Sequence, residues 1–197
     1  MKQTMKVIVA ILIFSSVVYA CKVKQQSNSV LQKNQPVAIQ EVEVDDESLI
    51  KMLSRNWIVN VVNYQADARK NVLYERGIDA NLHDFSKESF KITEDEKVVY
   101  TDEGGQKHLG TWDLKDSNTK LLMEFEDGQE VSWNIIEKGK NQLVIHMSID
   151  ARKVKWDIVN ISEIDIPTAA VFAGFYAGIV DEKTETVNIT YKMNPRG

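Results

Sequence analysis

The chain has little cysteine, little histidine and no excess of basic residues. Its one cysteine is Cys21, so no disulfide can form within the chain and the folded domain must be held by its hydrophobic core. The 197 residues include 24 basic and 29 acidic side chains, a net charge of −5, with no clustering of Lys and Arg. Direct binding of DNA or RNA requires a basic face, and we do not expect it here.

Sequence motifs of common enzymes are also missing. The chain contains no Gly-x-Ser-x-Gly elbow, no P-loop and no dinucleotide-binding fingerprint. Its three histidines, His83, His108 and His146, lie on separate segments, and a metal site formed by their convergence is the less favoured interpretation. We therefore predict a protein that is not an enzyme and has neither a cofactor nor a metal site.

The first twenty residues form a targeting segment. Lys2 and Lys6 precede an apolar run over residues 7–18, which is shorter than the roughly 20 residues that span a bilayer. The run ends in Val18-Tyr19-Ala20-Cys21. A small residue directly before a cysteine resembles the signal of bacterial lipoproteins.

This resemblance implies cleavage after Ala20 and attachment of fatty acyl chains, such as palmitate, to Cys21. Two or three acyl chains give lasting membrane attachment where one does not. In the sorting of such lipoproteins an Asp after the cysteine can cause retention at the inner membrane; Lys22 stands there, which implies the outer membrane. An ordinary secretory signal that ends beside a cysteine is the alternative.

Residues 21–47 are predicted to be a tether. Residues 22–40 are rich in Gln, Asn, Ser and Lys and cannot bury enough apolar surface to fold. The acidic run at 41–47 is expected to be the solvated end of this tether beside a helix N-terminus, with metal binding or docking as the alternative. The predicted organisation is a signal peptide at 1–20, the lipidated tether at 21–47 and a β-barrel domain at 48–197.

Short runs of alternating apolar and polar residues fill most of the predicted domain. Such runs, separated by turn sequences, predict an all-β, up-and-down antiparallel barrel of about eight strands. They lie at residues 56–64, 72–74, 90–93, 98–101, 108–115, 120–125, 131–136, 143–149 and 154–161, with a closing strand at 186–193. Residues 72–74 could instead be the middle of a helix that ends at Gly77, and residues 78–87 are expected to form a loop.

One face of each strand is predicted to point inward. On the first strand this face carries Trp57, Val59 and Val61, and the outer faces of the barrel are mostly polar. Aromatic girdles are missing, which disfavours a transmembrane barrel.

Two helices are expected beside the barrel. Residues 48–54 place Leu49, Met52 and Leu53 on one side, where they could plug one end of the barrel. Residues 167–180 are rich in Ala and Gly and are too short to span a bilayer. We expect this segment to pack closely on the barrel wall; dimerisation of a membrane helix through Gly174 and Gly178 is the alternative.

A meander barrel followed by a helix and one more strand is the order found in lipocalins. Together with Gly110-Thr111-Trp112 and the leader, this order resembles the lipocalin-like lipoproteins of Gram-negative bacteria. In lipocalins a Gly-x-Trp motif lies on the first strand; here Trp57 fits that position and Arg55 stands in place of the glycine. The resemblance covers about residues 48–192 and implies an envelope protein that can hold a small apolar ligand.

The inward aromatic and aliphatic residues are the candidate ligand site. The candidates for the cavity wall are Trp57, Phe90, Tyr100, Trp112, Trp133, Leu143, Ile145, Met147 and Trp156, with Phe90 and Tyr100 near the mouth. The same side chains could simply fill a small barrel. Two hypotheses follow: a lipid-anchored carrier of a small apolar molecule, or a solid barrel that contacts an envelope protein partner through its 78–87 loop or its outer face.

Overall fold

A computed structural model describes residues 46–154 and 165–197, which belong to one compact unit that begins at Val42. The elements, in chain order, are α1 (Asp46–Leu53), β1 (Asn56–Ala66), β2 (Arg69–Glu75), β3 (Ser89–Ile92), β4 (Lys97–Thr101), β5 (Lys107–Lys115), β6 (Lys120–Phe125), β7 (Glu130–Lys138), β8 (Leu143–Asp150), α2 (Ile166–Tyr176) and β9 (Thr186–Pro195). A short 3₁₀ turn, Ala151–Lys153, follows β8.

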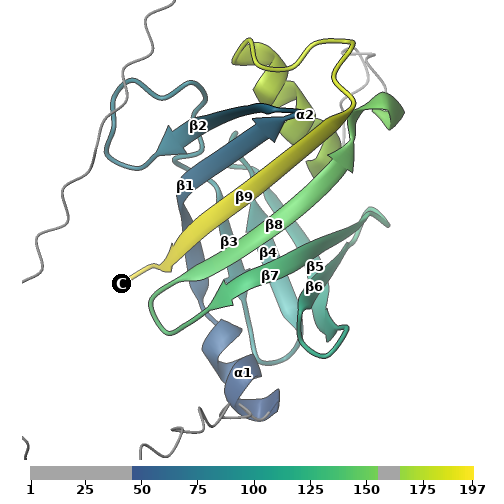
Figure 1. Cartoon of the computed structure of the whole chain (residues 1–197). Coiled ribbons are helices and arrows are strands. Elements are labelled where there is room, and N and C mark those ends of the chain that lie inside the picture. Colours follow the sequence, from purple (N-terminus) through teal and green to yellow (C-terminus); the bar gives the residue numbers. More distant parts are fainter. Residues whose placement is uncertain (1–45, 155–164) are drawn as a thin grey trace, which may run out of the picture. The chain divides into compact units, whose positions relative to one another are not determined.

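Eight of these strands close into an antiparallel barrel, as the alternation predicted (Figure 1). The order is β1-β3-β4-β5-β6-β7-β8-β9, and the pairing of β1 with β9 completes the circle. Strand β2 is additional and pairs with the second half of β1, beyond the part that pairs with β3. The strand interpretation of residues 72–74 is confirmed, and residues 78–87 form the expected loop.

The prediction that Val61 shares the inward face of Trp57 and Val59 is wrong. The register of β1 against β9 shifts between Val59 and Val61, so that one extra residue stands in β1. A β-bulge of this kind reverses the alternation beyond it. Val62, Tyr64 and Ala66 are therefore the buried residues in the second half of the strand.

Helix α1 lies at one end of the barrel and contributes to the core, as expected (Figure 1). Leu49 and Leu53 are completely buried, and Met52 packs against the same core. Burial of each leucine contributes about 1.5–3 kcal/mol. Trp57 continues this plug, because its indole Nε1 donates a 2.8 Å hydrogen bond to the carbonyl of Leu53.

Helix α2 packs closely on β1, in agreement with the predicted role of its small residues. The hydroxyl of Tyr64 donates a 3.0 Å hydrogen bond to the carbonyl of Ala170. A Cβ atom on Gly174 would stand 2.2 Å from that hydroxyl oxygen, so only glycine allows this approach. In the described ranges no helix has the length and apolar character needed to cross a bilayer.

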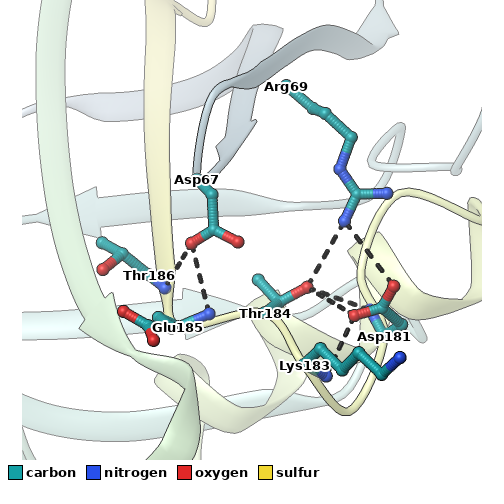
Figure 2. A network of polar contacts seen from close by, with 7 residues as sticks. All are labelled: Asp67, Arg69, Asp181, Lys183, Thr184, Glu185 and Thr186. Atoms are coloured by element: carbon teal, nitrogen blue, oxygen red, sulfur yellow. Dashed lines mark hydrogen bonds and ion pairs between the residues drawn. The ribbon is translucent and has the colours of Figure 1, made fainter.

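A polar network joins the β1–β2 turn to the turn before β9 (Figure 2). The carboxylate of Asp67 accepts hydrogen bonds from the backbone N–H groups of Glu185 (3.2 Å) and Thr186 (2.9 Å). Arg69 lies 3.9 Å from Asp181, whose carboxylate accepts from the N–H of Lys183. The network fixes the start of β9, the strand that closes the barrel.

The strand expected at residues 154–161 lies mostly outside the described residues. Strand β8 pairs with β7 through residues 143–146 and with β9 along its whole length. The neighbour of β8 in the closed barrel is thus β9, which follows α2 in the chain.

Candidate functional site

The predicted ligand-site residues that the structure describes are all buried. They are Trp57, Phe90, Tyr100, Trp112, Trp133, Leu143, Ile145 and Met147, and each belongs to the hydrophobic core. Trp156 lies outside the described residues. The alternation therefore predicts these core positions correctly.

Two of these residues, Trp57 and Trp112, have contacts at the end of the barrel that α1 occupies. Trp57 lies beside α1, and the Nε1 of Trp112 donates a 2.9 Å hydrogen bond to the carbonyl of Thr93 in the β3–β4 turn. Trp112 also borders a pocket of about 160 Å³ with Ile50 of α1. These two tryptophans belong to the end that α1 occupies, and their indole N–H groups are satisfied.

Three others, Phe90, Tyr100 and Trp133, join Tyr191 in a cluster of aromatic rings from four strands. Phe90 of β3 lies 4.9 Å from the ring of Tyr100 on β4, 6.2 Å from Trp133 on β7 and 6.2 Å from Tyr191 on β9, measured between centroids. Trp133 and Tyr191 are 5.1 Å apart. Rings at such separations touch, so these four side chains form one interior cluster. We call Phe90, Tyr100, Trp133 and Tyr191 the ring cluster.

A carboxyl group, Glu88, lies within this ring cluster. Glu88 is 2% exposed, and its Oε1 atom accepts hydrogen bonds from the hydroxyls of Tyr100 (2.6 Å) and Tyr191 (3.0 Å). Burial raises the pKa of Glu88 to about 8, although the two tyrosine hydrogen bonds lower it in part. Glu88 is therefore mostly protonated at neutral pH.

Two polar atoms of this region have no hydrogen-bond partner among the described residues. One is Oε2 of Glu88 and the other is Nε1 of Trp133. Both side chains adjoin Tyr191, the first through its hydroxyl and the second through its ring. Two further unpaired buried atoms, on Ser54 and Asn56, belong to the α1 end of the chain. Buried polar atoms are nearly always hydrogen-bonded, so an unpaired one requires an explanation, and a bound molecule that supplies the missing partner is one.

Two histidine–carboxylate pairs lie near Glu88, formed by residues of the 78–87 loop, the β4–β5 turn and the start of β5. Nε2 of His108 lies 2.9 Å from Asp102, and His83 pairs with Glu103. Phe85, in the 78–87 loop, is buried and contacts the ring of Tyr191 at 6.0 Å. These contacts hold the loops against the ring cluster.

Sequence reasoning missed Glu88 although one signal was available. Glu88 precedes Phe90 and Ile92 by two and four residues, and these two side chains are buried on β3. The period of two would have placed Glu88 on the same inward face. The polar run Ser86-Lys87-Glu88-Ser89 instead favours the end of the 78–87 loop and its border.

A groove also crosses the outer face of the sheet. It encloses about 650 Å³, within the range of small-molecule sites. Strands β1, β2, β8 and β9 provide its lining, and the surface that these residues expose in the groove is mainly apolar: Asn63, Tyr64, Gln65, Lys70, Asn71, Val72, His146, Asn188 and Thr190. None of the predicted ligand-site residues lines it.

No group of three metal-ligating side chains occurs within residues 46–154 and 165–197. Comparison with known proteins gave no relative: no family model matches the chain, and no curated protein does.

Proposed function

We propose that the protein is a lipid-anchored, lipocalin-like binding protein of the cell envelope that holds a small, mainly apolar molecule inside its barrel. The observation that carries this proposal is the pair of unpaired polar atoms, Glu88 Oε2 and Trp133 Nε1, in an otherwise apolar interior. A barrel core that served only stability would gain nothing from an unsatisfied carboxyl group, which costs free energy when buried.

The architecture supports the proposal. An eight-stranded barrel can hold one small ligand, and α1 closes one end. Aromatic walls with a few polar groups are the usual lining of small-molecule sites.

The membrane anchor rests on the leader sequence and Cys21. Replacement of the acylated residue, Cys21→Ser, should abolish incorporation of radiolabelled palmitate and release the protein from the membrane fraction. Retention of both label and membrane association in this variant would contradict the proposed anchor.

Uptake of N-phenyl-1-naphthylamine, a neutral apolar dye that fluoresces in dry surroundings, tests the binding function. The chain from Lys22, which contains the whole compact unit, should bind about one dye molecule and release it after an aliphatic competitor is added. Wild-type protein that takes up no dye and no competitor would contradict the binding function.

The second candidate is a filled barrel that acts as an envelope interaction module. The direct ring contacts of the ring cluster favour it, and the groove on the outer face offers a surface for a partner. A protein that carries no ligand but co-purifies at fixed stoichiometry with an envelope protein would support this alternative.

A further inference from the structure

The hydrogen bonds of Glu88 define which of its oxygens is free. Oε1 accepts from two hydroxyl groups, Tyr100 and Tyr191, and so both of its lone pairs are used. Oε2 has no partner among the described residues. In the neutral acid the proton therefore belongs on Oε2, which becomes a hydrogen-bond donor without an acceptor in the described part of the chain.

The surroundings of Glu88 favour the neutral acid. A buried carboxylate requires a cationic partner, and no Lys or Arg is buried in the described parts of the chain. The charged groups that act on it are Glu103 and Asp102, whose negative charge raises the pKa of Glu88 further. His83 and His108 pair with these two acids rather than with Glu88.

The other titratable groups that face Glu88 are tyrosines. Burial raises the pKa of Tyr100 and of Tyr191 well above the ordinary value, and burial also raises the pKa of Tyr64 on β1. These hydroxyls stay neutral across the physiological range and act as donors. They contribute no positive charge that could stabilise the ionised form of Glu88.

Trp133 supplies a second unmet donor. An indole N–H can donate and cannot accept, and Nε1 of Trp133 is buried without a partner among the described residues. Because Trp133 and Glu88 both contact Tyr191, the two donors belong to one region of the barrel. A molecule bound beside these two donors would satisfy them if it supplied a hydrogen-bond acceptor.

We propose that the barrel selects uncharged, mainly apolar molecules that carry a hydrogen-bond acceptor oxygen, such as the carbonyl of an ester, ketone or amide, and that Glu88 Oε2–H and Trp133 Nε1–H recognise that oxygen. This inference rests on the proposed binding function. A ligand carboxylate is disfavoured by the acidic side chains near Glu88. A ligand ammonium would require Glu88 to ionise, and it would leave the N–H of Trp133 without an acceptor.

Binding then depends on pH through Glu88. Ionisation removes the donor from Oε2 and places a negative charge next to the ligand oxygen. With a pKa of about 8, affinity is full at pH 6.5–7 and falls by roughly tenfold per pH unit well above 8. The protein would release its ligand in alkaline surroundings.

Four eight- or nine-carbon probes test the selectivity on the chain from Lys22: methyl octanoate, nonane, octanoate and octylamine. Binding is measured by calorimetry or by the fluorescence of the tryptophans. Methyl octanoate should bind at least about tenfold more tightly than each of the other three, the effect of one buried hydrogen bond. Equal affinity for methyl octanoate and nonane would overturn the inference while leaving the binding function intact. If no probe binds, the binding function itself fails.

Variants of Glu88 separate recognition from packing. Glu88→Gln keeps an acceptor for the tyrosines and a donor in place of Oε2–H, so it should bind methyl octanoate within about threefold of wild type at pH 7 and lose the fall in affinity at high pH. Glu88→Leu should bind at least about tenfold more weakly than Glu88→Gln. Glu124→Gln, the same change on the exposed outer face, should behave as wild type at every pH.

Thermal unfolding of each variant shows that it is folded before binding is compared. A fall in affinity that persists in Glu88→Gln would assign the pH dependence to another group and overturn the role of Glu88. Trp133→Phe, which keeps a ring and removes the N–H, provides an independent check. This variant should bind methyl octanoate more weakly than wild type does and bind nonane with unchanged affinity.

Discussion

Glu88 couples the stability of the barrel to pH, because its carboxyl group ionises at different pH in the unfolded and folded chain. The ordinary pKa is 4.5, and burial raises it to about 8 in the folded state. The unfolded chain therefore loses the proton first, and the folded state loses stability as the pH rises from 4.5 to 8. The contribution of neutral Glu88 to the free energy of unfolding is fully present below pH 4.5 and is lost above pH 8.

The variant Glu88→Gln should remove this loss. The free energy of unfolding of Glu88→Gln minus that of wild type should be about 3–5 kcal/mol larger at pH 8 than at pH 5, which is the size implied by the pKa of about 8. Urea unfolding at both pH values measures the difference, with Glu124→Gln as control. A difference between wild type and Glu88→Gln that does not change with pH would contradict the neutral buried acid.

Trp133 is the side chain whose removal should cost most in the ring cluster. It is completely buried and contacts Phe90 and Tyr191. Trp133→Ala should lower the free energy of unfolding by about 3–5 kcal/mol, since it removes a large ring and leaves a cavity. Denaturant unfolding monitored by circular dichroism measures this; a near-neutral result with altered ligand uptake would show that Trp133 lines a space instead.

At the scale of residues, the sequence predicted which side chains face inward and missed how one of them is used. Alternation identified Phe90, Tyr100 and Trp133 because apolar residues on a strand bury on one face. Glu88 obeys the same period, but a charged residue beside Lys87 is normally exposed, and only tertiary packing reveals the two tyrosine hydroxyls that surround it.

At the scale of elements, close approach between β1 and α2 depends on Gly174. A Cβ atom there would meet Cζ of Tyr64 at 2.4 Å as well as its hydroxyl oxygen. Gly174→Ala should therefore destabilise the protein by about 1–3 kcal/mol, although alanine is the better helix former. Thermal unfolding checks this against Ala169→Ser, a change at an exposed position of the same helix.

A Gly174→Ala variant that is as stable as wild type would show that α2 can shift away from β1. Replacement of Tyr64 by Leu in the same chain should recover part of the loss, since it removes the ring atoms that clash.

The elements themselves were largely predictable, and the irregular positions were not. Period-two runs located the barrel strands and β2, and the small residues at 167–180 indicated a closely packed helix. The bulge in β1 was hidden because Val59, Val61 and Val62 are all apolar, so either of two registers satisfied the pattern. Partners in the sheet decide between such registers, and these lie more than 120 residues away on β9.

At the scale of the whole molecule, the closed barrel provides a single hydrophobic core and pairs the first barrel strand with the last. Without a disulfide, its stability depends on one core, and closure through the β1–β9 pair removes exposed strand edges. The polar network around Asp67 secures this closure at the start of β9 (Figure 2). The interior ring cluster with Glu88 then lies inside a closed wall of strands.

The leader and tether complete the proposed account. If Cys21 is acylated, residues 22–45, which precede α1, would join the bilayer to a barrel that, in this proposal, exchanges small molecules with it or with the space around it. Ester and amide carbonyls are common in envelope lipids, and such molecules match the proposed selectivity for an acceptor oxygen.

Native mass spectrometry of the chain from Lys22, purified from its own envelope without detergent, tests the central claim most directly. The account predicts a discrete adduct of about one molecule per chain that organic extraction removes, and whose accurate mass contains at least one oxygen. A clean mass of the chain alone, with no binding of methyl octanoate when it is added back, would contradict the account and leave the filled barrel as an interaction module.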